Sequence, residues 1–404
     1  MRAEYTVVAP EFGIADGAAL QQPDDGLPLW LAAVSLRTGT TTHGSYSATV
    51  VGAAGLSRGS AWVRGVGEAV ERYALAPGDD EDLEAPAGFP DVTEEMAAHG
   101  VVGPLATNRS LLSARRLATG EPCAVPRAAV DYPGVDEDGL ADQTPSGAAS
   151  GLGRDRALVR ATLELIERDA FERAWQGVTT PHRVDLADLG EADADTRSML
   201  DQVESILLRH GRSVHLGVLP TITGVPAVTA LVQRGDGPVG VGCAAGDTIT
   251  TCAVKAIVEG IQVESLLTNW RESRGEACGH TVARPRTESE RIDYLGTPAA
   301  TRAAAEFAAS FTSGPAPRPV PPPATSVALA GDLAAVGVQT FAVDLTPRLP
   351  ERVQALGWCA VRVLSAGLQP LRGNDRLSWN WAPLRVPGRA GVDGAPTRPP
   401  HPLA

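Results

Sequence analysis

Lysine is nearly absent from this chain. Its 404 residues include 35 Lys and Arg together, and Lys255 is the one lysine among them. A P-loop binds nucleotide phosphates through a Gly-rich loop that ends in Lys followed by Ser or Thr. Since Ala256 follows Lys255, the chain has no P-loop. Any nucleotide phosphate that binds here must therefore be held by arginine and by other groups.

Long apolar runs and basic clusters are also missing. No stretch approaches the roughly 18 consecutive apolar residues of a transmembrane helix, so we expect no membrane partner. The start, MRAEYTVVAPEFG, lacks the basic segment and apolar core of a signal peptide, which predicts a cytoplasmic protein. The formal net charge of −13, without a run of arginines, argues against nucleic acid as a partner, because a phosphate backbone would be repelled.

Cysteine is scarce and scattered. The five cysteines form no C-x-x-C motif, and the seven histidines form no H-x-x-x-H pair. The spacing predicts reduced structural thiols and no zinc site. The cysteines are Cys123, Cys243, Cys252, Cys278 and Cys359.

What is present is a globular composition with mixed periodicities. Hydrophobic residues make up 43% of the chain, enough for a substantial core. Helical spacing predicts helices over Ser60–Tyr73, Ala157–Trp175, Ala194–Arg209, Thr250–Trp270 and 301–311. Strands are predicted at Ser47–Val51, Val214–Leu219, Ala227–Gln233, Val239–Gly242, Thr340–Val343 and Ala360–Leu364. The absence of a regular strand–helix alternation favours an α+β fold over a doubly wound sheet.

Proline and glycine suggest where the chain is divided. Residues 74–90 are predicted to form an acidic, turn-rich surface loop, and the Pro-rich residues 313–325 an exposed spacer. From Gly388 onward the chain is rich in Gly and Pro, which indicates an extended tail. We therefore predict an N-terminal segment 1–45, one large domain 46–387 and a C-terminal tail 388–404.

Three of the predicted helices carry polar pairs spaced i, i+3. At this spacing both side chains project from one helix face. Each helix also follows a Gly-rich stretch, at residues 52–55, 146–151 and 240–246. The pairs are Glu68 with Glu71, Glu164 with Glu167, and Glu259 with Gln262.

Paired carboxylates suit a particular chemistry. Their oxygens are hard ligands for Mg²⁺, which keeps substrate phosphates in its coordination shell. Arg72 and Arg168 directly follow two of the pairs and can bind phosphate bidentately. Together, such helices would form a Mg-ATP site without a lysine loop. The alternative is that each pair lies on a solvated helix face, where E-x-x-E is common.

These segments resemble the YcaO family, and within it the azoline-forming cyclodehydratases. GAAGLSRGSAWVRGVGEAVERY, residues 52–73, is similar to the family's glycine loop and first helix. TPSGAASGLGRDRALVRATLELIERDAF, residues 144–171, resembles its turn and L-E-[LV]-I-E-R-D-A helix. Residues 252–262, with the later Arg271, resemble its third helix. The resemblance covers about residues 40–404.

The resemblance implies a mixed α/β fold and binding of ATP and Mg²⁺. It also implies a reaction in which a Cys, Ser or Thr side chain of a precursor peptide attacks the preceding carbonyl. ATP then phosphorylates the amide oxygen, and phosphate leaves to give a thiazoline or oxazoline. The residues implied to hold Mg²⁺ and nucleotide are Glu68, Glu71, Glu164, Glu167, Glu259 and Gln262. The arginines implied to neutralise phosphate or to orient the glutamates are Arg72, Arg168 and Arg271.

The chain end matches the family in part. Azoline-forming members commonly end in a P-x-P-x-P-like tail that reaches the active site. Here the tail offers Pro400 and Pro402, and its last residue is Ala404. The resemblance therefore implies a role for these three residues in catalysis. The alternative is a disordered terminus.

Three positions depart from the family pattern. Ala54 replaces the lysine of the glycine loop, Arg64 replaces a helical serine, and Ser146 replaces the asparagine of the second turn. Losing a lysine near phosphate should weaken nucleotide binding, and Arg64 is a candidate to restore the charge. These departures also motivate a different hypothesis, a YcaO-fold scaffold that binds a peptide or a partner without turnover.

The product, the partner and one short motif each allow a second interpretation. Related members form thioamides or macroamidines. Since residues 1–45 are too short for an E1-like domain, we expect a separate E1-like or leader-binding partner, with a homodimer as a further assembly.

Residues 55–59, GLSRG, also match the G-x-S-x-G of a hydrolase, with Ser57 as nucleophile. Five-residue matches are common in a chain with 43 glycines, which weakens that interpretation.

Overall fold

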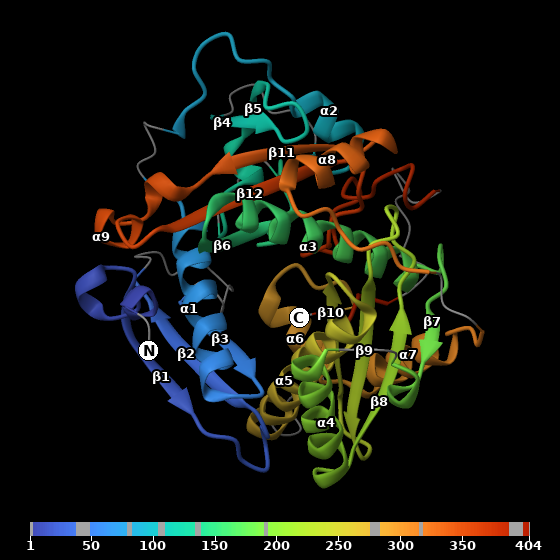
Figure 1. The fold of residues 1–404 in the computed structure, drawn as a ribbon. Coiled ribbons are helices and arrows are strands. Elements are labelled where there is room, and N and C mark those ends of the chain that lie inside the picture. The colour runs from blue at the N-terminus through green and yellow to red at the C-terminus, as the bar shows by residue number, and fades with distance from the viewer. Residues whose placement is uncertain are drawn as a thin grey trace.

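The structure is a computed structural model that describes residues 3–37, 49–78, 83–103, 110–133, 139–189, 193–274, 283–314, 318–387 and 399–403. Within these residues it forms a mixed α/β domain with three sheets (Figure 1). All pairings between the named strands are antiparallel. This agrees with the expected α+β class and excludes a doubly wound parallel sheet. No helix in the described part of the chain is long and apolar enough to cross a membrane.

The first sheet has three strands in the order β1-β2-β3. Its strands are β1 (Ala15–Gln21), β2 (Trp30–Leu36) and β3 (Val50–Gly55). Helix α1 (Arg58–Leu75) packs on β2 and β3. The predicted N-terminal segment 1–45 thus contributes β1 and β2 to the sheet that ends in β3, while the domain boundary at residue 45 stays a prediction.

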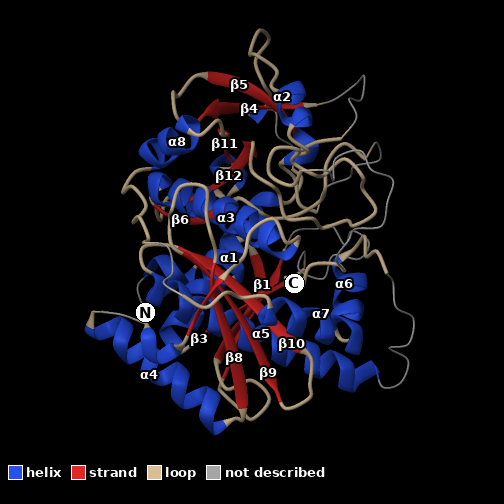
Figure 2. Ribbon diagram, turned by 90° about the vertical axis from the view of Figure 1, so that its right-hand side faces the viewer, coloured by secondary structure: helices blue, strands red, loops and turns tan. Residues whose placement is uncertain are grey.

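The second sheet has four strands in the order β10-β9-β8-β7. Its strands are β7 (His182–Val184), β8 (Arg212–Val218), β9 (Ala227–Arg234) and β10 (Val239–Ala245). Helix α5 (Ile249–Arg274) packs along β10 and β9, and α4 (Ala194–Arg209) packs beside it on β8. Figure 2, a view turned by 90° from Figure 1, also shows α5 lying against these strands.

The third sheet has five strands in the order β5-β4-β11-β12-β6. Its strands are β4 (Leu111–Arg116), β5 (Pro122–Pro126), β6 (Ala148–Leu152), β11 (Gln339–Asp344) and β12 (Trp358–Ala366). Helices α3 (Arg154–Trp175) and α8 (Ser326–Ala335) share one apolar cluster with this sheet. The other helices are α2 (Thr93–Ala98), α6 (Glu288–Leu295), α7 (Pro298–Ala309) and α9 (Glu351–Gln354).

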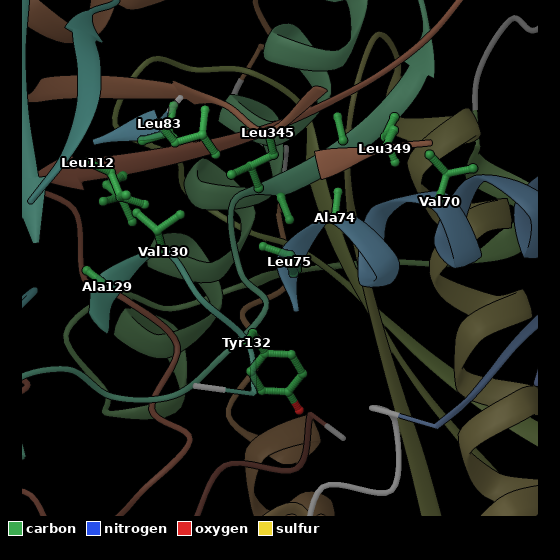
Figure 3. Packing of buried hydrophobic residues seen from close by; sticks show 14 of the residues in the cluster. Val70, Ala74, Leu75, Leu83, Leu112, Ala129, Val130, Tyr132, Leu345 and Leu349 are labelled. Atoms are coloured by element: carbon green, nitrogen blue, oxygen red, sulfur yellow. The ribbon is translucent and has the colours of Figure 1, made fainter. Parts of the chain in front are cut away.

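The largest apolar cluster surrounds the last turns of α1. Figure 3 shows Val70, Ala74 and Leu75 of this helix packed towards Leu345 and Leu349 of the segment after β11. Arg348 donates to the carbonyl of Ala74 at 3.0 Å, which satisfies a free carbonyl at the helix end. The apolar cluster and this cap fix the C-terminal half of α1 in place. The carboxylate pair of this helix, Glu68 and Glu71, lies in this same half.

The sequence predicted most long elements but missed several strands. The prediction for α4 is confirmed at both ends, whereas β3 lies later than the predicted Ser47–Val51. Residues 74–90 are not wholly a surface loop, because Leu83 is buried and α1 continues to Leu75. Among residues 313–325, those described after 317 lie outside helices and strands, as expected. The strands without a prediction are β1, β2, β4, β5, β6 and β7.

The C-terminal tail is described only at its end. Most of the predicted extended tail, residues 388–398, lies outside the described residues. The described end, residues 399–403, lies outside helices and strands. From Pro400 to Leu403 it is buried, and Leu403 joins the apolar cluster of α3 and α7. Burial of the apolar Leu403 against these helices accounts for this placement.

Candidate functional site

Each of the three carboxylate helices follows a strand of a different sheet. β3 leads into α1, β6 into α3 and β10 into α5, and the Gly-rich stretches lie mostly in these strands. Gly242 on β10 shows why a small residue is needed. A Cβ there would lie 2.1 Å from the carbonyl oxygen of Ala256, so α5 could not pack this closely on the strand.

The start of α1 explains the G-x-S-x-G match. The Ser57 hydroxyl accepts the backbone N–H of Ser60 at 3.1 Å, and the Ser60 hydroxyl accepts that of Ser57 at 3.1 Å. This reciprocal capping box stabilises the first turn of a helix. In the part of the chain that the structure describes, no hydrogen bond joins Ser57 to a histidine. Ser57 therefore has a structural role, and its geometry does not favour a hydrolase nucleophile.

The first carboxylate pair lies on a partly open face of α1. The side chains of Glu68 and Glu71 are 31% and 22% exposed. Arg72 Nη2 is 3.6 Å from Glu68 Oε1, and Arg72 Nε is 4.0 Å from Glu71 Oε1. The guanidinium also lies over the Tyr132 ring, 5.4 Å from its centroid. Arg72 thus attracts both carboxylates at distances too long for hydrogen bonds.

The second pair is held between two other elements. Glu164 Oε2 accepts the N–H of Gly147, in the turn before β6, at 3.0 Å. Glu167 Oε2 accepts the N–H of Ala245, at the end of β10, at 3.1 Å. Arg168 Nη2 lies 3.4 Å from Glu164 Oε1, and its Nε lies 3.6 Å from Glu167 Oε1. One oxygen of each carboxylate is therefore fixed by backbone, while the other faces an arginine.

The two members of the third pair, Glu259 and Gln262, have different hydrogen-bond partners. Glu259 Oε2 accepts the N–H of Cys243 on β10 at 2.9 Å. Gln262 accepts the N–H of Ala54 at 3.0 Å and donates to the carbonyl of Gly52 at 2.9 Å. Its amide therefore ties α5 to β3, a structural task that the sequence did not predict. The role of Gln262 as a metal ligand stays a prediction.

The three helices bring their carboxylates into one centre. Glu259 and Glu164 both act electrostatically on Glu68, which belongs to a third helix. Burial raises the pKa of Glu71 to about 8 and the pKa of Glu167 to about 8, and the neighbouring Glu164 adds to both. Burial also raises the pKa values of Glu68 and Glu259. We call Glu68, Glu71, Glu164, Glu167 and Glu259, with Arg72 and Arg168, the carboxylate centre.

The chemistry of this centre fits a divalent cation bound together with phosphates. A cation would relieve the repulsion among the carboxylates, and phosphates would find unpaired donors, because Arg72 Nε and Nη1 and Arg168 Nε have no hydrogen-bond partner. No group of three His, Cys, Asp or Glu side chains among the described residues is arranged to hold a metal by itself. Mg²⁺ needs no such group, since it usually takes one or two carboxylates plus waters and substrate phosphates.

The remaining candidate residues lie at different distances from the centre. Arg64 on α1 donates to the carbonyl of Ala54 at 3.0 Å, beside the strand that the family's lysine would occupy. Ser146 is buried in the turn before β6. Arg271 is exposed and lies twelve residues beyond Glu259 on α5, which is roughly 18 Å along the helix axis. The structure therefore does not bring Arg271 to the other candidates.

The described end of the chain is fastened beside α3. Trp175 Nε1 donates to the carbonyl of Pro399 at 2.9 Å, and Arg291 donates to that of His401 at 3.1 Å. Pro400 and Pro402 are both buried. Arg168 of the carboxylate centre contributes to the electrostatic field at His401. The last candidate, Ala404, lies outside the described residues.

The sequence did not single out two charged groups that the structure places nearby. Arg362 on β12 is buried with Glu164 and Glu71 as its main attracting charges. Arg372 and Asp375 form a buried ion pair at 3.0 Å that supports the C-terminal segment. A signal existed for Arg362, since an arginine within the apolar run CAVRVLSA is unexpected in a buried strand. The segment around Asp375 offered no comparable pattern.

Comparisons with known proteins give the family of this chain and solved structures with a similar fold. Residues 52–369 match the family model described as YcaO cyclodehydratase, ATP- and Mg²⁺-binding. The chain belongs to the YcaO family. A search of curated proteins finds no match to the sequence. The family identification therefore rests on the family model, which covers all three carboxylate helices.

Solved structures show the same fold at low identity. A heterocyclase in complex with substrate and cofactor matches at 18% identity and a TM-score of 0.68, over 95% of this chain and 54% of that chain. YcaO from Methanopyrus kandleri, bound with AMPPCP and Mg²⁺, matches at 18% identity and 0.63, over 98% and 95%. The E. coli microcin synthetase McbBCD complex with pro-MccB17 bound matches at 11% and 0.63, over 96% and 96%. This chain thus spans about half the length of the heterocyclase.

Proposed function

We propose that this protein activates backbone amides of a ribosomal precursor peptide with ATP and Mg²⁺. In this proposal it cyclises Cys, Ser or Thr side chains to thiazolines or oxazolines. The observation that carries the proposal is the meeting of carboxylates from α1, α3 and α5 beside two arginines. Family membership supports it, as does the relative from Methanopyrus kandleri that is bound with AMPPCP and Mg²⁺.

The chain's own residues would supply binding and orientation. The residues proposed to hold Mg²⁺ and nucleotide are the five glutamates of the carboxylate centre, with Arg72 and Arg168 facing the phosphates. Mg-ATP, when bound, supplies the phosphoryl group that turns a poor amide-oxygen leaving group into phosphate. The backbone N–H groups of Gly147, Cys243 and Ala245 hold three of the carboxylates in fixed orientations before any ligand binds.

The peptide would undergo one balanced change for each ring. Its side-chain sulfur or oxygen loses its proton and bonds to the preceding carbonyl carbon. The former carbonyl oxygen takes the γ-phosphoryl group of ATP, which becomes ADP, and leaves as phosphate, while the amide nitrogen loses its proton to form C=N. The net change in the peptide is the loss of one water. Pro400, Pro402 and Ala404 are proposed to take part from the chain end. The burial of Pro400 and Pro402 beside α3 supports this placement.

The proposal is tested by binding and then by turnover. Isothermal titration with AMPPCP and Mg²⁺ should show binding, and phosphate should be released when ATP, the cognate peptide and its partner are present. Mass spectrometry should find the peptide lighter by one water for each ring formed. Absence of both AMPPCP binding and phosphate release would rule out the enzyme hypothesis. Incorporation of sulfur, or closure of the peptide by an amidine, would assign the product to the thioamide or macroamidine alternatives.

A scaffold without turnover is the second candidate function, favoured by the three departures from the family pattern. Ala54 is 1% exposed in the apolar cluster of α4 and α5, so its side chain provides no charge. Against the scaffold, Arg64 brings a guanidinium to the carbonyl of this same residue. Changing Arg64 to serine, the residue usual in the family, separates the two. In an enzyme that relies on Arg64, the substitution should lower nucleotide affinity. In a scaffold, it should have no functional effect, and peptide binding should stay unchanged.

The proposed partners are a precursor peptide and an E1-like or leader-binding protein, with a homodimer as an alternative assembly. Two relatives support this part of the proposal, because one is a heterocyclase in complex with substrate and another is a microcin synthetase complex with pro-MccB17 bound. Neither a nucleic acid nor a membrane is proposed as a partner. Co-purification of this chain with the product of a neighbouring gene, followed by light scattering, distinguishes a partner complex from a homodimer.

A further inference from the structure

Four arginines of the described residues are buried, and one of them differs from the others. Arg212, Arg291 and Arg372 each have a carboxylate oxygen within 3.0 Å. Arg362 is only 4% exposed, yet no ion pair joins it to any described residue. A buried charge without a counter-ion is costly to the folded state. Its presence therefore calls for a role other than stabilising the fold.

Arg362 is a charged residue in a largely apolar strand. It lies in the middle of β12, where all nine residues are buried, and the adjacent Val361 and Val363 belong to the core beneath α3, on the opposite face of the strand. It pairs with Ala148 of β6 across the sheet. Its Nη2 donates to the carbonyl of Thr144 at 2.8 Å, whereas Nε and Nη1 have no hydrogen-bond partner. One bond leaves most of the donor capacity of the guanidinium unused.

Arg362 is nevertheless connected to the carboxylate centre. Glu164 and Glu71 are the charges that attract it most strongly. The turn 144–147 links them through backbone, because Arg362 holds the carbonyl of Thr144 while Glu164 holds the N–H of Gly147 at 3.0 Å. Burial lowers the pKa of Arg362 to about 10, so the group is still a cation at neutral pH. Arg72 and Arg168 each face their own carboxylates, whereas Arg362 adds a positive charge that none of these contacts neutralises.

We propose that Arg362 is a positioning residue of the nucleotide site, which favours anionic phosphates through its charge and holds the turn 144–147 in place. This inference rests on the proposed function. The expected effect of Arg362 on affinity has opposite signs for anionic and cationic ligands, because a fixed positive charge attracts an anion and repels a cation. Arg362 therefore strengthens binding of a nucleotide but does not strengthen binding of a bare divalent cation. A residue with a purely structural role would affect both in the same direction.

The test compares two substitutions that separate charge from hydrogen bonding. Arg362→Gln keeps a donor for Thr144 without the charge, and Arg362→Lys keeps the charge. Calorimetric titrations at pH 7 use AMPPCP with saturating Mg²⁺ in one series and MnCl₂ alone in the other. For Arg362→Gln we expect about tenfold weaker AMPPCP binding, with Mn²⁺ binding unchanged or tighter. For Arg362→Lys we expect AMPPCP binding within about threefold of the wild type, since a lysine ammonium is also a cation and carries hydrogen-bond donors.

The control is Arg115→Gln, an exposed arginine on β4 of the same sheet that donates to Gly120, and it should change neither titration. Unchanged AMPPCP binding in Arg362→Gln, or a parallel loss of AMPPCP and Mn²⁺ binding, would overturn the inference and leave the proposed function standing. A wild type that binds no AMPPCP would overturn both. If Arg362→Gln does not fold, Arg362→Lys decides: a folded variant with tenfold weaker AMPPCP binding contradicts a role for the charge.

Discussion

Two groups of charged and polar residues in this structure are built in opposite ways. In the carboxylate centre, arginine nitrogens lie 3.4–4.0 Å from glutamate oxygens, and the Glu164 side chain is 28% exposed. In the second group, which we call the C-terminal clamp (Arg291, Arg372, Asp375, Asp142 and Asn380), Asp375 lies 3.0 Å from two arginines and is 3% exposed. The clamp is a closed set of ion pairs and hydrogen bonds, whereas the carboxylates of the centre are partly exposed and several arginine nitrogens there have no hydrogen-bond partner.

The difference separates charges that hold the fold from charges available to a ligand. In the clamp, Arg372 Nε also donates to Asn380 Oδ1 at 2.9 Å, and Asp142 accepts the N–H groups of Gly373 and Asn374 at 2.9 Å each. Such satisfied networks fix a single arrangement of the chain. In the centre, burial raises the pKa of Glu71 and of Glu167 from 4.5 to about 8, whereas in the clamp it raises the pKa of Asp142 from 3.8 to about 6. Binding of a cation would supply what the protein itself does not.

The largest effect is expected from opening the clamp. Asp375→Asn removes the negative charge between Arg291 and Arg372, which leaves two buried cations without a counter-ion. We expect the free energy of unfolding to fall by about 3–5 kcal/mol in urea denaturation. As a control, Asp16→Asn breaks an exposed ion pair with Arg37 and should cost less than about 1 kcal/mol. Equal losses in the two variants would contradict the assignment of the clamp as structural.

Substitutions in the carboxylate centre should lower activity and leave stability unchanged. Glu164→Gln and Glu259→Gln keep the shape of the side chains but remove the charges proposed to hold Mg²⁺. We expect phosphate release to fall by at least about a hundredfold, with the thermal midpoint preserved. Glu272→Gln, an exposed position near the end of α5, is the matched control and should retain activity. Full activity in both centre variants would refute the proposed metal site.

The pH dependence of stability should differ from the usual loss in acid. The pKa of Glu71, like that of Glu167, is raised from 4.5 to about 8 in the folded protein, so the folded state binds more protons than the unfolded state between these values. Their contribution to stability is fully present below pH 4.5 and is lost as pH rises through about 8. Glu71→Gln should flatten this slope in denaturation curves measured without Mg²⁺. A wild type whose stability rises over the same interval would contradict the assignment.

The smallest effect on stability is expected from removing the hydrogen bond that holds the C-terminal residues beside α3. Trp175→Phe keeps an aromatic ring in the cluster with Phe171 and Phe307 but removes the hydrogen bond to Pro399. We expect a loss of about 1 kcal/mol in unfolding free energy. Release of the last residues by carboxypeptidase should become faster. Unchanged release would show that this bond does not hold the segment.

The sequence revealed the helices of the centre because their signals are local. Apolar spacing and the i, i+3 pairs located Glu68, Glu164 and Glu259 on three helices, and the structure brings all three together. Local spacing could not indicate what each carboxylate contacts. Gln262 looked like a member of a ligand pair, yet both ends of its amide bind β3, more than 200 residues earlier in the chain. Arg271 was placed in the site through resemblance alone, and the straight α5 carries it away.

The misses have the same cause. β1 and β2 pair with β3 through contacts that a short window cannot detect, and the Gly-rich residues 146–151 resembled a turn, although β6 begins at Ala148, because glycine in the interior of a strand weakens it. In β10 glycine is required by the helix packed above it, as the clash at Gly242 shows. Ser57 resembled a nucleophile because five residues carry no information about which groups lie beside the hydroxyl.

By itself, the sequence determined the class of fold, the family and the three helices that carry paired polar groups. It also excluded a P-loop, because the chain contains a single lysine. Only the tertiary structure decided which charged groups are paired within the fold and which remain available to a ligand. Asp375 is neutralised by Arg291, 84 residues away in the chain, while Glu164 and Glu71 attract Arg362 without forming an ion pair with it. Charge compensation depends on distance in space, and sequence spacing fixes that distance only within one helix or strand.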